Sequence, residues 1–232
     1  MYSFQSRVRY SEVDKRGILT LSSLIDYFQD CSTFQSEDLN IGLSYLNEMN
    51  RAWILNGWQV LIKRLPSLGE KLEIGTWPYG FKGIYGYRNF IIQTDKSEIL
   101  AVANSIWVFM NTESMYPTRI PADNLGYQLE PPYPMDYADR KVPIPDHLIS
   151  YPSFPVLRSN IDSYNHVNNG QYIKMAEEFL PEDFYVSQMR VEYRTSALLG
   201  DIIKPMVFQS KDKITVVLAD TKDKPYAIVE FI

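Results

Sequence analysis

The sequence predicts an α+β protein made of two similar units in tandem. Twice along the chain, a short strand-like segment is followed by a turn, a helix and several strands rich in β-branched and aromatic residues. Val13-Asp14 matches Ile161-Asp162, and Leu24-Ile25 matches Tyr172-Ile173, both at an offset of 148 residues. One helix over one face of an antiparallel sheet is α+β packing. A period near half the chain indicates two related units and not a solenoid.

In the first unit, residues 4–10 are typical of a strand, and Asp14 and Gly17 provide turn chemistry. Thr20 is a good N-cap for a helix whose apolar residues recur at helical spacing until stop signals near Asn40 and Gly42. Four strands are expected next, over residues 52–64, 70–78, 85–94 and 100–110.

A proline-rich segment separates the two units. Residues 111–155 hold nine of the chain's 14 prolines, which fix φ and remove backbone donors, so we expect a stiff, partly extended linker on the surface. The pattern then repeats: a short strand over 154–161, a turn, a helix to about Phe179 before Pro181, and strands over 188–193, 201–209, 213–220 and 226–231.

Composition excludes several classes of protein. The net charge of −5 argues against a duplex nucleic-acid binder, which needs a basic face. The single cysteine, Cys31, excludes an intrachain disulfide scaffold, and its place on the first helix predicts a buried, inert thiol. No apolar run is long enough to span a membrane and no signal peptide is apparent, so we expect a cytoplasmic protein.

One segment concentrates chemistry-bearing side chains. Asp162-Ser163-Tyr164-Asn165-His166-Val167-Asn168-Asn169 holds an acid, an imidazole and three carboxamides at an expected helix start. A polar capping box would explain Asp162 or Asn165 but does not require His166. The backbone amides of a helix start can stabilise a carbonyl oxygen that becomes negative, and a carboxylate or imidazole can activate water. The segment therefore suits hydrolysis of an ester or thioester without a serine or cysteine nucleophile.

Other sites lack support in the sequence. There is no GxSxG elbow, no GxxxxGK[ST] loop and no GxGxxG motif. The two histidines and one cysteine do not have zinc-site spacing, so we expect neither a metal nor another cofactor. His147, in the linker, is expected to be an ordinary surface residue.

At these residues the chain resembles the acyl-[acyl-carrier-protein] thioesterase family of plant plastids and bacteria. The similar pieces are RYSEVDKRGILTLSSLIDYFQD, KLEIGTWP, SIWVFMNTESMYPTRIP, IDSYNHVNNGQYI and VEYR. The resemblance implies two tandem hotdog domains, each a long helix wrapped by an antiparallel β-sheet. Residues 1–115 would be an acyl-chain-binding, catalytically silent domain, 116–152 the linker, and 153–232 the catalytic domain.

The family's catalytic pattern is Asp-x-Asn-x-His-Val-Asn-Asn. Asp162 and His166 match it, whereas its Asn falls on Tyr164, for which Asn165 is the candidate substitute. The resemblance thus implies Asp162, His166 and Asn165 as catalytic residues, and the backbone amides of Val167 and Asn168 as the site for the thioester carbonyl. A family Glu-Cys pair falls on Ser196 and Ala197, which leaves the general base open.

The implied reaction is hydrolysis of fatty acyl-[acyl-carrier-protein] to free fatty acid and holo carrier protein. The implied partner is an acyl carrier protein bearing a fatty acyl phosphopantetheine, steered by a local basic patch for which Arg190, Arg194, Lys63 and Arg64 are candidates. A non-catalytic acyl-binding or carrier-docking module and an acyl-CoA thioesterase are alternatives, and a hotdog dehydratase is a weaker one. Both a monomer and a homodimer remain open, as does the preferred chain length.

Overall fold

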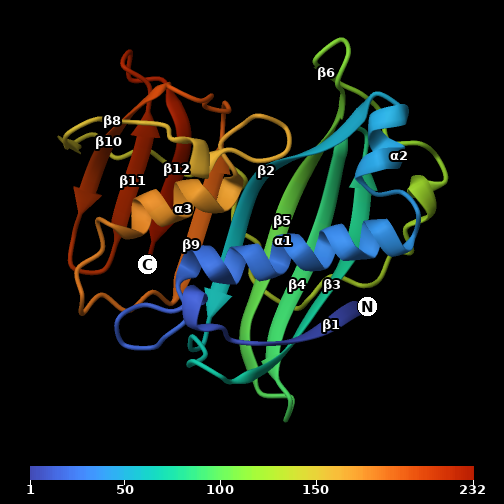
Figure 1. Ribbon diagram of the computed structural model, residues 1–232, viewed down its shortest axis with the longest axis horizontal. Coiled ribbons are helices and arrows are strands. Elements are labelled where there is room, and N and C mark those ends of the chain that lie inside the picture. The colour runs from blue at the N-terminus through green and yellow to red at the C-terminus, as the bar shows by residue number, and fades with distance from the viewer. The chain divides into compact units, whose positions relative to one another are not determined.

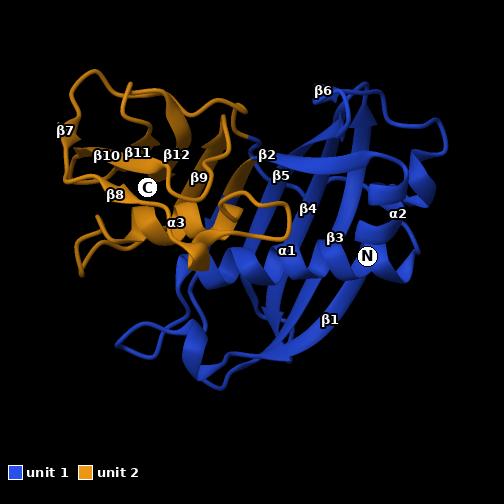
Figure 2. Cartoon of the chain, turned by 45° about the horizontal axis from the view of Figure 1, so that its top comes forward, with its two compact units in different colours: residues 1–56, 60–137 blue, residues 57–59, 138–232 orange.

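The computed structural model describes all 232 residues, which form two compact units. Unit 1 comprises residues 1–56 and 60–137, and unit 2 comprises residues 57–59 and 138–232 (Figure 2). Each unit is an antiparallel sheet with a helix on one face (Figure 1), as the sequence predicts. No helix is long and apolar enough to cross a membrane.

The sheet of unit 1 has the strand order β1-β3-β4-β5-β2, with β6 paired to β5. Helix α1 begins after the predicted cap, Thr20, whose hydroxyl oxygen accepts a hydrogen bond from the Ser23 amide at 3.2 Å. The elements are β1 (Tyr2–Arg7), η1 (Tyr10–Glu12), α1 (Leu21–Asp38), α2 (Leu43–Glu48), β2 (Arg51–Ile62), β3 (Lys71–Lys82), β4 (Tyr85–Thr94), β5 (Ile99–Asn111), β6 (Tyr116–Pro117) and η2 (Asn124–Gly126).

Alternation along the strands gives this sheet two apolar faces. Phe90 and Ile92 lie on the face covered by α1, where the rings of Phe28 and Phe90 are 5.2 Å apart. Ile91 points to the other face and packs with Trp77. Cys31 on α1 is completely buried, and burial raises the pKa of its thiol to about 12, as expected for an inert cysteine.

The sheet of unit 2 has the order β9-β12-β11-β10-β7, with β8 paired to β10. Its helix, α3, covers only nine residues, against 18 in α1, and ends at Glu177, two residues before the predicted end. The elements are β7 (Ile149–Ser150), β8 (Phe154–Pro155), η3 (Arg158–Asn160), α3 (Asn169–Glu177), β9 (Gln188–Tyr193), β10 (Ile202–Gln209), β11 (Ile214–Ala219) and β12 (Pro225–Phe231).

The proline-rich linker packs on the sheets through its backbone. In unit 1, the indole N–H of Trp77 donates to the Pro131 carbonyl at 2.9 Å, and the Asn89 carboxamide oxygen accepts from the Tyr133 amide at 2.9 Å. In unit 2, the Val142 amide donates to the Glu192 carboxylate at 2.9 Å. Side-chain acceptors and donors thus replace the ladder hydrogen bonds that a proline-rich segment cannot form.

Candidate functional site

The Asp162 side chain organises the loop that precedes α3. Its Oδ1 accepts hydrogen bonds from the amides of Tyr164 at 2.8 Å and His166 at 3.3 Å. Its own amide donates to the His166 carbonyl at 2.8 Å, and Ile161 forms an antiparallel bridge with Val167. Asp162 and His166 are therefore held in one tight turn, as the sequence predicts, but through the backbone of His166 and not through its ring.

Asn165 lies at the tip of this turn and is exposed. Its φ of 60° is in the left-handed region, which asparagine tolerates better than most residues. The conformation gives the residue a structural reason to be asparagine, independent of chemistry. The neighbouring His166 is half-buried, and its imidazole makes no hydrogen bond within the chain.

The two amides expected to bind the thioester carbonyl already have acceptors. The Val167 amide donates to the Ala197 carbonyl at 3.0 Å, and the Asn168 amide donates to the Asn160 carbonyl at 2.9 Å. Neither amide can take a further acceptor without giving up its bond. Asn168 caps α3 through Oδ1, which accepts from the Gly170 amide at 2.8 Å, so its side-chain Nδ2 is the remaining donor.

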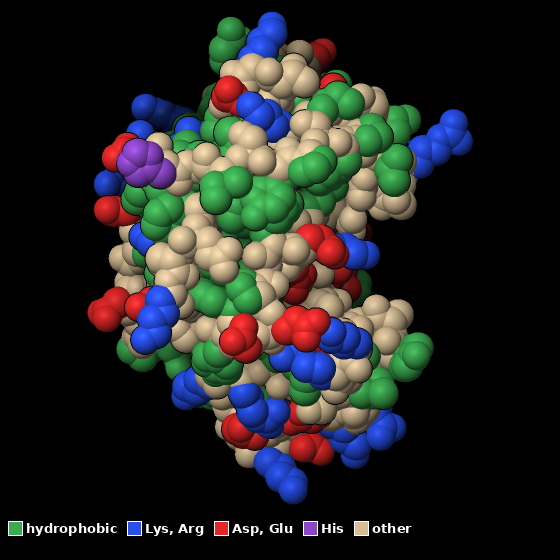
Figure 3. Space-filling model, turned by 90° about the vertical axis from the view of Figure 1, so that its left-hand side faces the viewer, with side chains coloured by type: hydrophobic (Ala, Val, Ile, Leu, Met, Phe, Trp, Pro, Cys, Tyr) green, Lys and Arg blue, Asp and Glu red, His purple; other side chains and the backbone are tan.

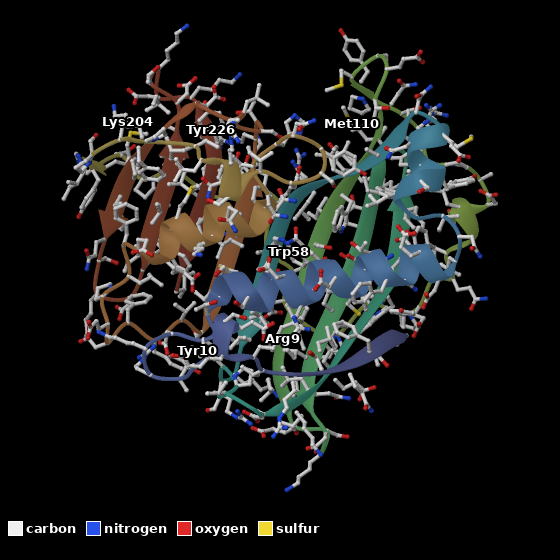
Figure 4. The ribbon with its side chains drawn as sticks, viewed as in Figure 1. Arg9, Tyr10, Trp58, Met110, Lys204 and Tyr226 are labelled. Carbon is white, nitrogen blue, oxygen red and sulfur yellow. The ribbon has the colours of Figure 1, made fainter.

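The equivalent loop of unit 1 repeats this backbone arrangement. Asp14 Oδ1 accepts from the amides of Arg16 at 2.9 Å and Ile18 at 3.0 Å. The Asp14 amide donates to the Ile18 carbonyl at 2.8 Å, and Gly17 has a φ of 76° where Asn165 has 60°. In both units a 3₁₀ turn precedes the loop, and Tyr10 at the start of η1 is labelled in Figure 4.

The repeat separates what the loop needs for folding from what it does not need. The carboxylate, the left-handed residue and the helix cap are present in both units, whereas Ile18 stands where unit 2 has His166. Because unit 1 forms the same loop without an imidazole, His166 is not required by the fold. It is the residue of this loop with the strongest claim to a chemical role.

Two tyrosines that the sequence did not single out as site residues tie the loop to its surroundings. The Tyr172 hydroxyl accepts from the Ala197 amide at 2.8 Å, and the Tyr193 hydroxyl donates to the Asn169 carbonyl at 3.0 Å. Burial raises the pKa of Tyr172 to about 12. Ala197 is completely buried, with both its amide and its carbonyl engaged, whereas Ser196 beside it is exposed. The departures from the family pattern at these positions therefore lie directly beside the Asp162 loop.

Arg190, Arg194 and Arg64 of the predicted basic patch form ion pairs within the chain, and the patch itself stays a prediction. Arg190 bonds to Glu230 at 3.1 Å and to two linker carbonyls, and Arg194 bonds to Glu192 at 2.9 Å. Arg64 bonds to both Glu70 and Glu98 at 2.7 Å. On the face in Figure 3, Lys and Arg side chains likewise lie among Asp and Glu. His147 is exposed, as expected.

The arrangement offers no metal centre, since no group of three or more His, Cys, Asp or Glu side chains is placed to hold an ion. What the loop does offer is a carboxylate with one bonded and one unbonded oxygen, a half-buried imidazole and carboxamides. Groups of these types can position water and transfer a proton.

Comparison with known proteins identifies the family. Residues 1–126 match the acyl-ACP thioesterase N-terminal domain, and residues 147–228 match the acyl-ACP thioesterase C-terminal domain. The chain belongs to the acyl-ACP thioesterase family. The predicted resemblance is thereby confirmed.

Two curated relatives of this acyl-ACP thioesterase family member are plant proteins. Acyl-[acyl-carrier-protein] hydrolase FATB2, chloroplastic, of Cuphea viscosissima is 31% identical over 157 residues, which are 61% of this chain and 37% of the relative. A chloroplastic palmitoyl-acyl carrier protein thioesterase of Gossypium hirsutum is 24% identical over 214 residues, which are 84% of this chain and 51% of the relative. The chain thus spans about a third to a half of the length of such relatives.

Solved structures of the family share the fold. An acyl-ACP thioesterase from Bacteroides thetaiotaomicron superposes with a TM-score of 0.90 at 21% identity, covering 99% of this chain and 96% of the other. The 12:0-ACP thioesterase from Umbellularia californica gives 0.79 at 16% identity, covering 100% and 96%. The two units of this acyl-ACP thioesterase family member are accordingly hotdog domains, and the predicted fold class is confirmed.

Proposed function

We propose that the chain hydrolyses the thioester of fatty acyl-[acyl-carrier-protein] and releases free fatty acid and holo carrier protein. Family membership over both units supports the reaction class. The observation that carries the assignment to unit 2 is the imidazole at position 166, in a loop that unit 1 forms without one. Unit 1 would then be catalytically silent and would bind the acyl chain in its apolar interior.

In this proposal Asp162 activates water with the oxygen that the loop leaves unbonded. Oδ1 holds the amides of Tyr164 and His166, while Oδ2 makes no hydrogen bond within the chain. Water bound to Oδ2 adds to the thioester carbonyl carbon and gives its proton to the carboxylate. Asp162 would therefore have two roles, positioning His166 and acting as general base.

The remaining steps use the imidazole and the carboxamides. The carbonyl oxygen becomes negative as water adds, and the Asn168 Nδ2 or the exposed Asn165 carboxamide donates to it. When the intermediate collapses, the carbon–sulfur bond breaks and His166 protonates the departing thiolate. The products are a carboxylic acid and a free thiol, and the site is restored when protonated Asp162 gives up its proton and His166 takes one up.

A non-catalytic acyl-binding or carrier-docking module is the second candidate. Tyr164, Ser196 and Ala197 favour it, because they replace catalytic groups of the family pattern. An acyl-CoA thioesterase is the third, since the proposed steps act on a thioester group whichever thiol carries it. Opposite charges on two proteins speed their association. Arg64, Arg190 and Arg194 form ion pairs within this chain, which reduces their attraction for an acidic carrier protein.

One assay series separates the three. Purified protein is given acyl-carrier-protein and acyl-CoA thioesters of matched chain length, and both free thiol and free fatty acid are measured. Faster turnover of the carrier-protein thioesters supports the proposal, and faster turnover of the CoA esters supports a CoA thioesterase. Bound fatty acid with no thiol release from either series supports a binding module.

A further inference from the structure

Unit 1 holds an arginine that none of the steps above uses. Arg88, on β4, is 7% exposed and lies on the sheet face that α1 covers. Its Nη1 donates to the Gln35 carboxamide oxygen on α1 and to Thr76 Oγ1 at 3.1 Å. The Tyr127 ring lies under the guanidinium, 5.2 Å from Arg88 Cζ to the ring centroid. All three partners are neutral, so no carboxylate of the chain balances this buried charge.

A buried cation without a counter-charge is costly, and natural arginines avoid it by pairing. Two half-buried arginines, Arg190 and Arg64, follow this rule through Glu230, Glu70 and Glu98. A third, Arg51, donates to the carbonyls of Met49 and Asn50. Burial lowers the pKa of Arg88, but a guanidinium keeps its proton in proteins. The positive charge of Arg88 therefore persists in the interior of unit 1.

The geometry leaves one edge of the guanidinium unused. Nη1 carries both hydrogen bonds, whereas Nε and Nη2 have no acceptor in the chain. No nitrogen of Arg88 is among the side-chain atoms that are both fully buried and without a hydrogen bond. Nε and Nη2 of Arg88 are therefore in the small part of this side chain that is exposed. The Nε–Nη2 edge is one that binds a carboxylate through two parallel hydrogen bonds. Gln35, Thr76 and Tyr127 hold it in a fixed orientation beforehand.

Further aromatic rings continue from the Tyr127 ring that lies under the guanidinium. The ring centroids of Tyr127 and Phe81 are 6.0 Å apart, and those of Phe81 and Trp53 are also 6.0 Å apart. Gly86 lies two residues before Arg88 on the same face of β4, and a Cβ atom there would lie 3.1 Å from the rings of Phe81 and Trp53. A small inorganic anion could bind the guanidinium but would not contact the aromatic rings. A ligand with a hydrocarbon chain would contact both.

We propose that unit 1 binds the carboxylate of a free fatty acid on the Nε–Nη2 edge of Arg88, with the hydrocarbon chain against the neighbouring aromatic rings. The site is separate from the Asp162 loop and binds a carboxylic acid, not a thioester. It gives unit 1 a ligand whether or not unit 2 hydrolyses thioesters. Where unit 2 does, the reaction product would be a ligand of unit 1.

The test measures binding to the full chain by calorimetry at neutral pH, with decanoate, methyl decanoate and acetate. Decanoate should bind at least about tenfold more tightly than methyl decanoate, because a charged two-bond contact is lost in the ester. Acetate should bind more weakly still, since it lacks the chain. Equal affinities for decanoate and its methyl ester in the unaltered protein would overturn the proposal, and equal affinities for acetate and decanoate would overturn the hydrocarbon part of it.

Variants assign the contact to Arg88. Arg88→Met should bind decanoate no more tightly than the methyl ester. Arg88→Lys keeps the positive charge but cannot form two parallel hydrogen bonds, so its decanoate affinity should lie between those of Arg88→Met and the unaltered chain. Arg64→Met is the matched control in the same unit, because its guanidinium already has two carboxylates, and it should leave the decanoate preference unchanged. A preference for decanoate that survives in a folded Arg88→Met protein would contradict the proposal. The comparison of ligands on the unaltered chain decides the matter if that variant fails to fold.

Discussion

Asp14 and Asp162 accept equivalent pairs of backbone hydrogen bonds in the two units. Each carboxylate binds the amides two and four residues further along, and each amide donates to the carbonyl of the fourth residue. Asp14 does so in a loop without an imidazole. Its pKa is lowered because hydrogen bonds from Ile18 and Arg16 outweigh the opposing effect of burial. The pair is a built-in control for the role of the carboxylate.

This control separates folding from chemistry. Asp162→Asn keeps an oxygen that can accept both amides, so its free energy of unfolding should change by less than about 1 kcal/mol. Its turnover of acyl-carrier-protein thioester should fall about 100-fold or more if the carboxylate is the general base. Asp14→Asn should leave turnover unchanged but lose some unfolding free energy at pH 7, because its lowered pKa and its ion pair with Arg16 stabilise the ionised carboxylate. Urea denaturation and thiol release measure the two effects, and normal turnover by Asp162→Asn would reduce Asp162 to a positioning residue.

Removal of the acceptor should destabilise both loops. Asp162→Ala and Asp14→Ala each leave two amides without their bond, which corresponds to about 1–3 kcal/mol of unfolding free energy. Only Asp162→Ala should also impair turnover per folded molecule. Equal loss of turnover in Asp14→Ala would show that the effect of the carboxylate is purely structural.

Tyr172 should support the loop through one hydroxyl. Tyr172→Phe removes the acceptor of the buried Ala197 amide, so we expect a loss of about 1–3 kcal/mol in unfolding free energy with little change in packing. Denaturation in urea measures the loss. Tyr2→Phe is a suitable comparison, because it removes a hydroxyl that bonds at the exposed surface to Asp38. A loss for Tyr172→Phe no larger than for Tyr2→Phe would contradict the inferred role.

Acid stability should depend on Glu70. Two hydrogen bonds from Arg64 and one from the Ser67 amide hold its pKa below the ordinary value of 4.5. A carboxylate whose pKa is lower in the folded state contributes stability above its unfolded pKa and loses it as the pH falls through the folded pKa. Glu70→Gln should therefore be less stable than the unaltered chain at pH 7 and should lose less stability between pH 4.5 and 3.

Thermal unfolding across this pH range tests the assignment. Glu113→Gln changes an exposed carboxylate that forms no ion pair. It should lose as much stability between pH 4.5 and 3 as the unaltered protein does. If Glu70→Gln and Glu113→Gln have the same pH dependence, the Arg64–Glu70 pair does not contribute to acid stability.

Local signals in the sequence predicted the repeat and most elements of the fold. Thr20 is the cap of α1, and the strands over 85–94 and 188–193 have the predicted bounds, because capping chemistry and β-branched runs act over a few residues. The length of α3 was less predictable. Its last residues turn into i→i+3 bonds ahead of Pro181, and the segment over 154–161 forms only a two-residue strand and a 3₁₀ turn.

The turn that holds Asp162 and His166 was predictable from the sequence, but its contacts were not. Asp162 and His166 lie close together because they are four positions apart in a turn. The sequence does not reveal that Ala197, 30 residues beyond Val167, takes the Val167 amide, nor that Glu230 pairs with Arg190. Such partners depend on strand pairing and loop packing, which bring distant residues together without a local pattern.

The imidazole at position 166 is the central claim, and its replacement tests it most directly. His166→Ala is compared with Ile18→Ala, the change at the equivalent position of unit 1, by thiol release from fatty acyl-[acyl-carrier-protein] under saturating substrate, with folding checked by circular dichroism. The account predicts that His166→Ala loses at least about 100-fold in kcat while Ile18→Ala keeps its kcat. Unimpaired turnover by a folded His166→Ala protein would contradict it.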